Sequence, residues 1–302
     1  MALLIVLGLV ALISAWAVEA SYEDMIELRR AQNIQDLIRA RMACLSGLNL
    51  AAQLLIEDQR RGNKYDDLRE KWARPMPAFE IDEGRVWVRI EDLERYVGLG
   101  LLLNEQGKPD LARIQRTKQW FASHGFDAAK VDALVDWMDA DGNVSGPAGA
   151  EDPSYYERPY HVPNRPPVLW NEIRQIRGFE DGRIQEAMAG TFSAFPAYDA
   201  KQPAVNLNTT SVDALLIAFP TLDRADAEGL IDGRPYHDIK QALQRVPQIG
   251  QKGRVRLSIS SRYFIVTTEA AFGRARYAER FLVERERKKG VRLLARERMV
   301  DE

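Results

Sequence analysis

The sequence predicts an α+β fold in which a long N-terminal helix packs on an antiparallel sheet and a large all-α domain is inserted into that sheet. A helical pattern runs unbroken over roughly residues 1–58, and stretches rich in β-formers occur at 72–93 and 261–298. Helical segments fill the interval of about 98–255 between them. With 302 residues, 46% of them hydrophobic and 28% charged, the chain has room for two domains and the composition of a globular protein.

The first 18 residues contain no charged side chain. As a helix they would span about 27 Å, close to the ~30 Å hydrocarbon core of a bilayer, so residues 1–20 are predicted to be a transmembrane segment. A cleaved secretory signal is the alternative. Such signals carry a basic region ahead of the apolar run, whereas the first basic residue here is Arg29.

The segment that follows, 21–58, has no proline and a single glycine, Gly47. Its apolar residues recur close to the helical period of 3.6. We therefore expect one continuous helix of about 60 residues, with its first third in lipid and one stripe of the remainder packed on a soluble domain.

Both β regions read as hairpins or meanders. The first region has two predicted strands, 79–81 and 85–90, on either side of the turn Asp-Glu-Gly at 82–84. The second region comprises the segments 261–272 and 275–298, and a turn is predicted within the latter at Lys288-Lys289-Gly290. The basic residues Arg285, Arg287, Lys288 and Lys289 alternate with glutamates, which is typical of a solvated edge strand rather than a nucleic-acid patch.

The interval between the β regions contains six candidate helices, with Asp127 and Ser211 as N-caps and Gly178 and Gly233 as C-caps. The candidates are 108–124, 127–139, 167–178, 211–220, 224–233 and 237–246. The predicted units are 1–20, 21–97, 98–255 (divided at about residue 200 into 98–200 and 201–255) and 256–302.

Composition excludes several classes of site. A net charge of −2 gives no electrostatic reason to expect a nucleic-acid partner. One cysteine, Cys44, and three scattered histidines cannot build an ordinary structural zinc site or an intramolecular disulfide. The sequence contains no nucleophile-elbow or phosphate-loop motif, so we do not expect an enzyme. The five tryptophans beyond Trp16 are expected to be core anchors.

One loop has the composition of a cation site, WMDADGNVSGPAGAED at 137–152. Asp139, Asp141 and Asn143 alternate as calcium ligands do in tight loops, and Glu151 and Asp152 follow. The EF-hand register fails, because Val144 stands where that loop needs glycine and Ala150 where it needs its bidentate acid. The candidate ligands for calcium are thus these five residues, and a solvated turn held by Asx hydrogen bonds is the alternative.

The whole pattern resembles the type IV pilins and the pseudopilins of type II secretion, and most closely the K-type minor pseudopilins. Most of these chains carry glutamate at the fifth mature position, which is Ile5 here, and loss of that glutamate marks the K type. Five motifs carry the resemblance through the soluble part. They are WARPM (72–76), AEDPSYYERPYHVPNRP (150–166), PVLWNEIRQIRGF (167–179), VNLNTTSVDAL (205–215) and SRYF (261–264).

One junction departs from the family pattern. Family members commonly enter the insertion with Gly-Arg-Phe-Asn-Leu-Asn, whereas this chain has Glu-Arg-Tyr-Val-Gly-Leu at 94–99. Both asparagines are therefore absent at this position. We expect Asn206 and Asn208 to cap turns ahead of the helix that starts at Ser211.

The resemblance implies a type IV pilin-like fold and calcium binding in the helical domain. It implies an inner-membrane, single-pass protein with its soluble part in the periplasm of a Gram-negative bacterium. Met1 would be the N-terminus left by a prepilin peptidase and then methylated. The protein would form the pseudopilus tip with the I- and J-type minor pseudopilins, contact further pseudopilins of the filament, and help to initiate or limit pseudopilus assembly during export across the outer membrane.

A second reading is a membrane-anchored periplasmic binding module with a helix-hairpin-helix-like subdomain that binds DNA. VNLNTTSVDALLIAFP (205–220) resembles the start of such a module. The hairpin that follows lacks the glycines that approach a phosphate, and it carries Asp223 and Asp226 there instead.

Overall fold

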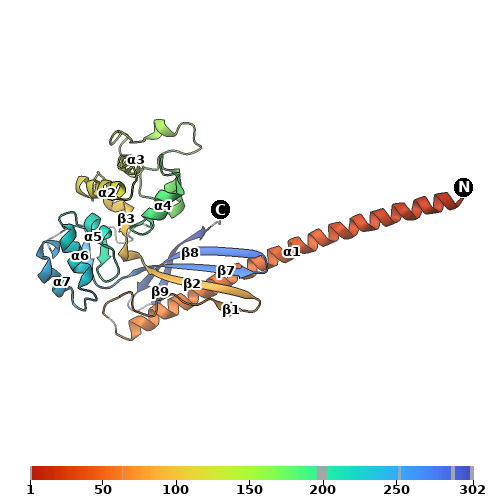
Figure 1. The fold of residues 1–302 in the computed structure, drawn as a ribbon, viewed down its shortest axis with the longest axis horizontal. Helices are drawn as coiled ribbons and strands as arrows, with labels where there is room; N and C mark the ends of the chain where they lie inside the picture. Colours follow the sequence, from red (N-terminus) through yellow and green to blue (C-terminus); the bar gives the residue numbers. More distant parts are fainter. Residues whose placement is uncertain (1, 63, 196–202, 251–252, 287–289, 300–302) are drawn as a thin grey trace.

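The computed structural model describes residues 2–62, 64–195, 203–250, 253–286 and 290–299. Helix α1 (Ala2–Arg60) runs unbroken for 59 residues, which confirms the predicted single helix. Its N-terminal part projects away from the rest of the molecule (Figure 1), and the first residue that it buries is Ala40. It is long and apolar enough to span a membrane, with a mean hydropathy of 2.3 over its best window.

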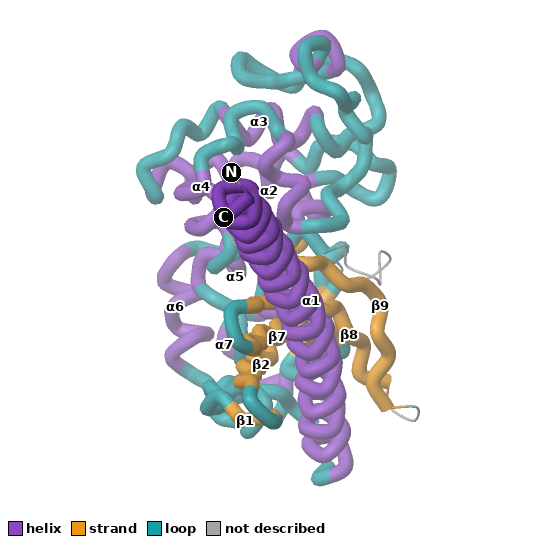
Figure 2. Tube along the Cα trace, turned by 90° about the vertical axis from the view of Figure 1, so that its right-hand side faces the viewer, coloured by secondary structure: helices purple, strands orange, loops and turns teal. Residues whose placement is uncertain are grey.

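The body of the protein is the C-terminal part of α1 packed on one face of a five-stranded antiparallel sheet (Figure 2). The strand order is β1 (Phe79–Ile81), β2 (Gly84–Asp92), β7 (Tyr263–Phe272), β8 (Ala275–Glu286) and β9 (Gly290–Met299). The predicted hairpin at 79–92 is confirmed by the pairing of β1 with β2. The turn at Lys288-Lys289 lies outside the described residues.

Small side chains on α1 allow the helix to approach the sheet closely. A Cβ at Gly47 would lie 2.9 Å from the Val88 side chain and 3.1 Å from that of Thr268, so only glycine fits without a shift. β2 alternates buried and exposed residues, and its buried set faces α1. Trp72 completes this core edge-to-face against Phe264, with ring centroids 5.2 Å apart.

The helical domain is inserted between β2 and β7, and it lies at the end of the body away from the N-terminus of α1 (Figure 1). Its α-helices are α2 (Leu111–Ser123), α3 (Lys130–Asp136), α4 (Gly182–Met188), α5 (Val212–Ala218), α6 (Arg224–Asp232) and α7 (Ile239–Arg245). Two short parallel pairs join them, β3 (Val97–Gly98) with β4 (Phe192–Ser193) and β5 (Ala204–Asn206) with β6 (Arg256–Ser258). The domain is therefore mainly, not wholly, helical.

Several local predictions in this domain are wrong. The segment predicted as a helix at 167–178 forms only a 3-10 helix, η4 (Trp170–Gln175), and Gly178 follows it at a φ of 87°. Helix α4 was not predicted. Asp127 does not cap α3, because its carboxylate accepts a hydrogen bond from Ala129 N, before the helix begins. Ser211 and Gly233 do occupy the predicted cap positions of α5 and α6.

The tryptophans divide between core and surface. Trp72, Trp120 and Trp137 are buried, as predicted. Trp87 is 37% exposed, because it lies on the face of β2 opposite α1. Asp223, in the segment where a helix-hairpin-helix module would bind phosphate, caps α6 by accepting a hydrogen bond from Asp226 N.

Candidate functional site

The predicted cation loop begins at the buried C-terminal end of α3. Asp139 is 2% exposed, and its backbone N–H still bonds to the carbonyl of Val135. The chain then leaves the domain surface as an exposed loop and returns at Ala150 and Glu151, which is 5% exposed. The structure thus buries the first and the fourth of the five candidate ligands.

Asp136, the last residue of α3, holds this loop against the helix by accepting hydrogen bonds from it. Its Oδ1 accepts a hydrogen bond from Ser145 N at 2.9 Å, and its Oδ2 accepts one from Ala150 N at 2.7 Å. Sequence reasoning missed this role. The available signal was the spacing, since residues three apart share a helix face and Asp136 precedes Asp139 by three.

Two oxygen atoms in the loop are buried without a partner. Asp139 Oδ1 and Glu151 Oε1 accept no hydrogen bond from any described residue. Burial, reinforced by Asp141 and then Asp136, raises the pKa of Asp139 to about 6. Burial, reinforced first by Asp136 at the end of α3 and then by the aspartates of the loop, raises the pKa of Glu151 to about 7. Crowded carboxylates with unsatisfied oxygens are the kind of donor that a hard cation binds, so the chemistry of these two residues is compatible with calcium.

The other three candidates lie at the exposed rim. Asp141 Oδ1 accepts hydrogen bonds from the backbone N and the Nδ2 of Asn143, at 2.9 and 2.7 Å, which is the Asx geometry of the alternative reading. Asp152 Oδ1 accepts one from Val162 N at 2.8 Å. Asp141 and Asp152 are still close enough to Glu151 to raise its pKa.

Two glycines are needed for the loop to close on α3. A Cβ at Gly149 would overlap Asp136 Oδ2 and the Val144 side chain, and one at Gly146 would overlap the Asp132 carboxylate. We expect Gly149→Ala to lower the stability of the protein by about 1–3 kcal/mol, because the added methyl group must displace the Asp136 carboxylate. Thermal unfolding followed by circular dichroism measures this change.

Gly142→Ala in the same loop is the matched control, because a Cβ there meets nothing within 4 Å. It should leave the melting temperature unchanged. Equal effects of the two substitutions would contradict this account of the loop.

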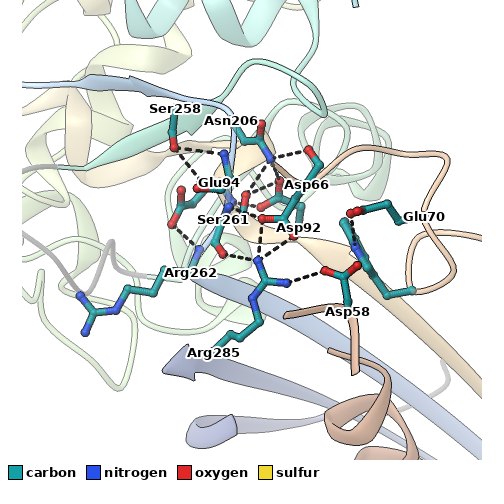
Figure 3. A network of polar contacts seen from close by, with 12 residues as sticks. Asp58, Asp66, Glu70, Asp92, Glu94, Asn206, Ser258, Ser261, Arg262 and Arg285 are labelled. Carbon is teal, nitrogen blue, oxygen red and sulfur yellow. Dashed lines mark hydrogen bonds and ion pairs between the residues drawn. The ribbon is translucent and has the colours of Figure 1, made fainter. Parts of the chain in front are cut away.

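A second group of acids lies where the helical domain meets the body (Figure 3). Asp58, Asp66 and Glu70 each offer a carboxylate oxygen, and these oxygens lie within 4.8 Å of one another, a convergence that the five loop residues do not reach in the described structure. Arg285 already supplies a cation here. Its Nη1 lies 3.0 Å from Asp58 Oδ2, and its Nη2 lies 2.6 Å from both oxygens of Asp66. We therefore assign this cluster to Arg285 and not to a metal.

The prediction that the basic cluster lies on a solvated edge strand is wrong for Arg285. Its side chain is 8% exposed, and its guanidinium lies over the Phe264 ring, 4.7 Å from the centroid. β8 is an interior strand, and β9 forms the edge of the sheet. Arg287, Lys288 and Lys289 lie outside the described residues.

Asn206 has a larger role than a turn cap. Its Oδ1 accepts a hydrogen bond from Asn208 N, as a capping side chain would. Its Nδ2 donates to Asp92 Oδ2, Ser261 Oγ and the Asp66 carbonyl, at 2.9 to 3.2 Å, so it also joins the helical domain to the body.

Comparisons with known proteins agree on one family. A family model described as type II secretion system protein K matches residues 97–196. The type II secretion system protein K of Pseudomonas aeruginosa is 30% identical over 98% of this chain and 91% of its own length. That of Aeromonas hydrophila is 28% identical over 82% of this chain and 80% of its own length.

The fold also matches a solved structure. A chain in the crystal structure of the GspK-GspI-GspJ complex from enterotoxigenic Escherichia coli superposes with a TM-score of 0.70, at 20% identity, over 90% of this chain and 100% of that one. The α+β fold is therefore shared with the matched chain over nine-tenths of this chain. The chain belongs to the type II secretion system protein K family, the minor pseudopilins.

Proposed function

We propose that this protein forms the tip of the pseudopilus together with I- and J-type minor pseudopilins and helps to initiate or limit its assembly. The placement of the helical domain carries this proposal. The domain covers the end of the body opposite the N-terminus of α1 (Figure 1), where it would obstruct a further subunit stacked on that end. A subunit of this shape fits the tip and obstructs growth beyond it.

Helix α1 supplies the surface for assembly. Beyond the apolar anchor it exposes large hydrophobic side chains that the body does not cover. They are Tyr22, Met25, Leu28, Ile34, Leu37, Ile38, Met42 and Leu50. Exposed apolar surface of this extent on a projecting helix fits packing against the helices of other pseudopilins. The solved complex of a related K protein with I and J proteins supports the choice of partners.

The membrane position follows from the same helix. We propose that the apolar segment crosses the inner membrane and that the body and helical domain lie in the periplasm. Ile5 carries no carboxylate that would need a partner in lipid, which suits a subunit with no neighbour above it. Cleavage of a basic leader by a prepilin peptidase and methylation of the new N-terminus belong to this proposal.

We also propose that the loop at 137–152 binds calcium through Asp139, Asp141, Asn143, Glu151 and Asp152. The unpartnered oxygens of Asp139 and Glu151 form the buried side of the site. Asp141, Asn143 and Asp152 would complete it from the exposed rim. The cation would supply charge neutralisation and would fix the loop to the end of α3, so its contribution is to stability.

Co-purification of the full-length protein with I- and J-type pseudopilins from detergent-solubilised membranes tests the assembly role. We expect Ile38→Asp together with Met42→Asp to reduce recovery of both partners at least about tenfold, because each change places a charge in an apolar helix contact. Leu111→Asp is the matched control, since Leu111 is 78% exposed on the helical domain. Unchanged recovery with the α1 variant would refute the proposed interface.

A further inference from the structure

The helical domain is joined to the body by two chain crossings that lie side by side. The outgoing chain leaves β2 at Asp92, and the returning chain enters β7 at Tyr263. Glu94 connects the two, because its Oε1 accepts a hydrogen bond from Arg262 N at 2.9 Å (Figure 3). Any change in the angle between domain and body must therefore alter the surroundings of Glu94.

The two aspartates beside Glu94 each have several hydrogen-bond donors, which oppose the burial that raises the pKa of Asp92 above its usual range and that of Asp66 to about 6. Asp92 Oδ2 accepts hydrogen bonds from Asn206 Nδ2, Thr209 Oγ1 and Ser261 Oγ, at 2.6 to 2.9 Å. Asp66 binds Arg285 with both oxygens and also accepts a hydrogen bond from Ser261 N at 2.7 Å. Multiple donors and a direct guanidinium contact are what a buried carboxylate needs.

Glu94 lacks this support. It is 8% exposed, and its Oε2 is buried with no hydrogen-bond partner in the described part of the chain. The guanidinium of the nearby Arg262 is paired with Glu284, which leaves Glu94 only the backbone N–H of that residue. An ionised Glu94 would thus be a buried charge without a compensating partner beside two other carboxyl groups, whereas a neutral carboxyl group costs much less to bury.

The electrostatic surroundings agree with this geometry. Burial and then the Asp92 charge raise the pKa of Glu94 to about 8, against the hydrogen bond from Arg262 and the charge of Arg256. Other charged groups at the junction come from α1 and the chain after it, from β6 and from the ends of β7, β8 and β9. They are Asp58, Asp66, Glu70, Arg256, Arg262, Glu284, Arg285 and Arg292.

We propose that Glu94 is a proton-operated lock on the hinge between the helical domain and the body. The neutral carboxyl group holds the two crossings together, and its ionisation loosens them. The closed junction retains the proton to a higher pH than an opened one, in which Glu94 meets water and ionises near its ordinary pKa of about 4.3. Opening therefore becomes easier as the pH rises from about 5 to 8 and levels off above that.

Hydrogen exchange of the full-length protein in detergent, followed by mass spectrometry, tests the lock. After correction for the intrinsic pH dependence of amide exchange, protection of the segments 92–97 and 258–263 should fall on the order of tenfold per pH unit between pH 6 and 8. Protection of α1 between Ala40 and Leu55 should not change over this range. A flat corrected profile for the two crossings would overturn the proposal without any variant.

The substitution Glu94→Gln tests whether Glu94 is the group that carries the proton. Glutamine keeps the acceptor for Arg262 N and cannot ionise, so the variant should show pH-independent protection at the level that the wild type reaches only near about pH 4, where the opened junction also keeps the proton. Glu83→Gln, at an exposed turn of the body, should retain the wild-type slope. If Glu94→Gln also retained that slope, the proton would reside on Asp66 or Glu70 and the assignment to Glu94 would be wrong.

Discussion

Arg285→Met is expected to be the most destabilising single substitution at the domain junction, with a loss of about 3–5 kcal/mol, because it removes one partner of a buried ion-pair network. It leaves Asp58 and Asp66 without the guanidinium that joins them, and it breaks the bond from Arg285 Nη2 to the Ser261 carbonyl at 2.9 Å. Methionine keeps much of the contact with Phe264, so the loss of stability would come from the removed charge rather than from a smaller side chain. The melting temperature should drop by about 6 °C or more.

This loss should depend on pH in a defined direction. Burial raises the pKa of Asp66 to about 6 even with Arg285 present, and removal of the arginine raises it further. A raised carboxyl pKa means that the folded protein gains stability as the pH falls toward the unfolded value near 4, so the variant should recover part of its stability between pH 7 and 5.

Arg61→Met is the control for the Arg285 substitution. Arg61 pairs with Glu57 on the exposed end of α1, where an ion pair contributes little, and its loss should leave the melting temperature close to that of the wild type. Equal effects of the two substitutions, or a loss at Arg285 that does not change with pH, would contradict the role given to the junction.

The parts of the fold that the sequence predicts are those set by local pattern. α1 could be predicted because periodic apolar residues and the absence of proline specify a helix without reference to the rest of the chain. The β1–β2 hairpin could be predicted from its turn residues and from the alternation of apolar and polar residues in β2. The segment at 167–178 misleads because its apolar spacing also suits a 3-10 helix, which the flanking prolines and the contacts with the domain core select.

The junction could not be predicted, because its interactions join residues far apart in the chain. Arg285 meets Asp66 across 219 residues, and nothing in the sequence near Arg285 distinguishes it from the other basic residues of that run. The same holds for Asn206, because a cap motif in the sequence accounts for its hydrogen bond to Asn208 but gives no sign of its hydrogen bond to Asp92. At the cation loop, the alternation and the acidic pair after it predict five candidate ligands, but they give no sign that Asp139 and Glu151 are buried while Asp141 and Asp152 lie toward solvent.

Calcium is expected to raise the melting temperature of the full-length protein by roughly 5–10 °C when it exceeds its dissociation constant about a hundredfold, which corresponds to about 2.7 kcal/mol of binding linkage. The physical reason is that Asp139 and Glu151 bury unpartnered oxygens among like charges, a cost that the cation removes. Thermal unfolding in excess calcium and in excess chelator measures the difference. An identical melting curve in the two conditions would refute calcium binding.

Glu151→Ala and Asp141→Ala should each abolish the calcium-dependent increase, and Glu186→Ala, an exposed acid on α4 of the same domain, should retain it. The chelator condition separates loss of a ligand from loss of the fold. Without the cation, Glu151→Ala removes a carboxylate that other acids repel, so the variant should melt at or above the temperature of the wild type in chelator. A variant that melts lower than the wild type in chelator would show that Glu151 stabilises the loop without a cation, which would contradict the repulsion among these carboxylates.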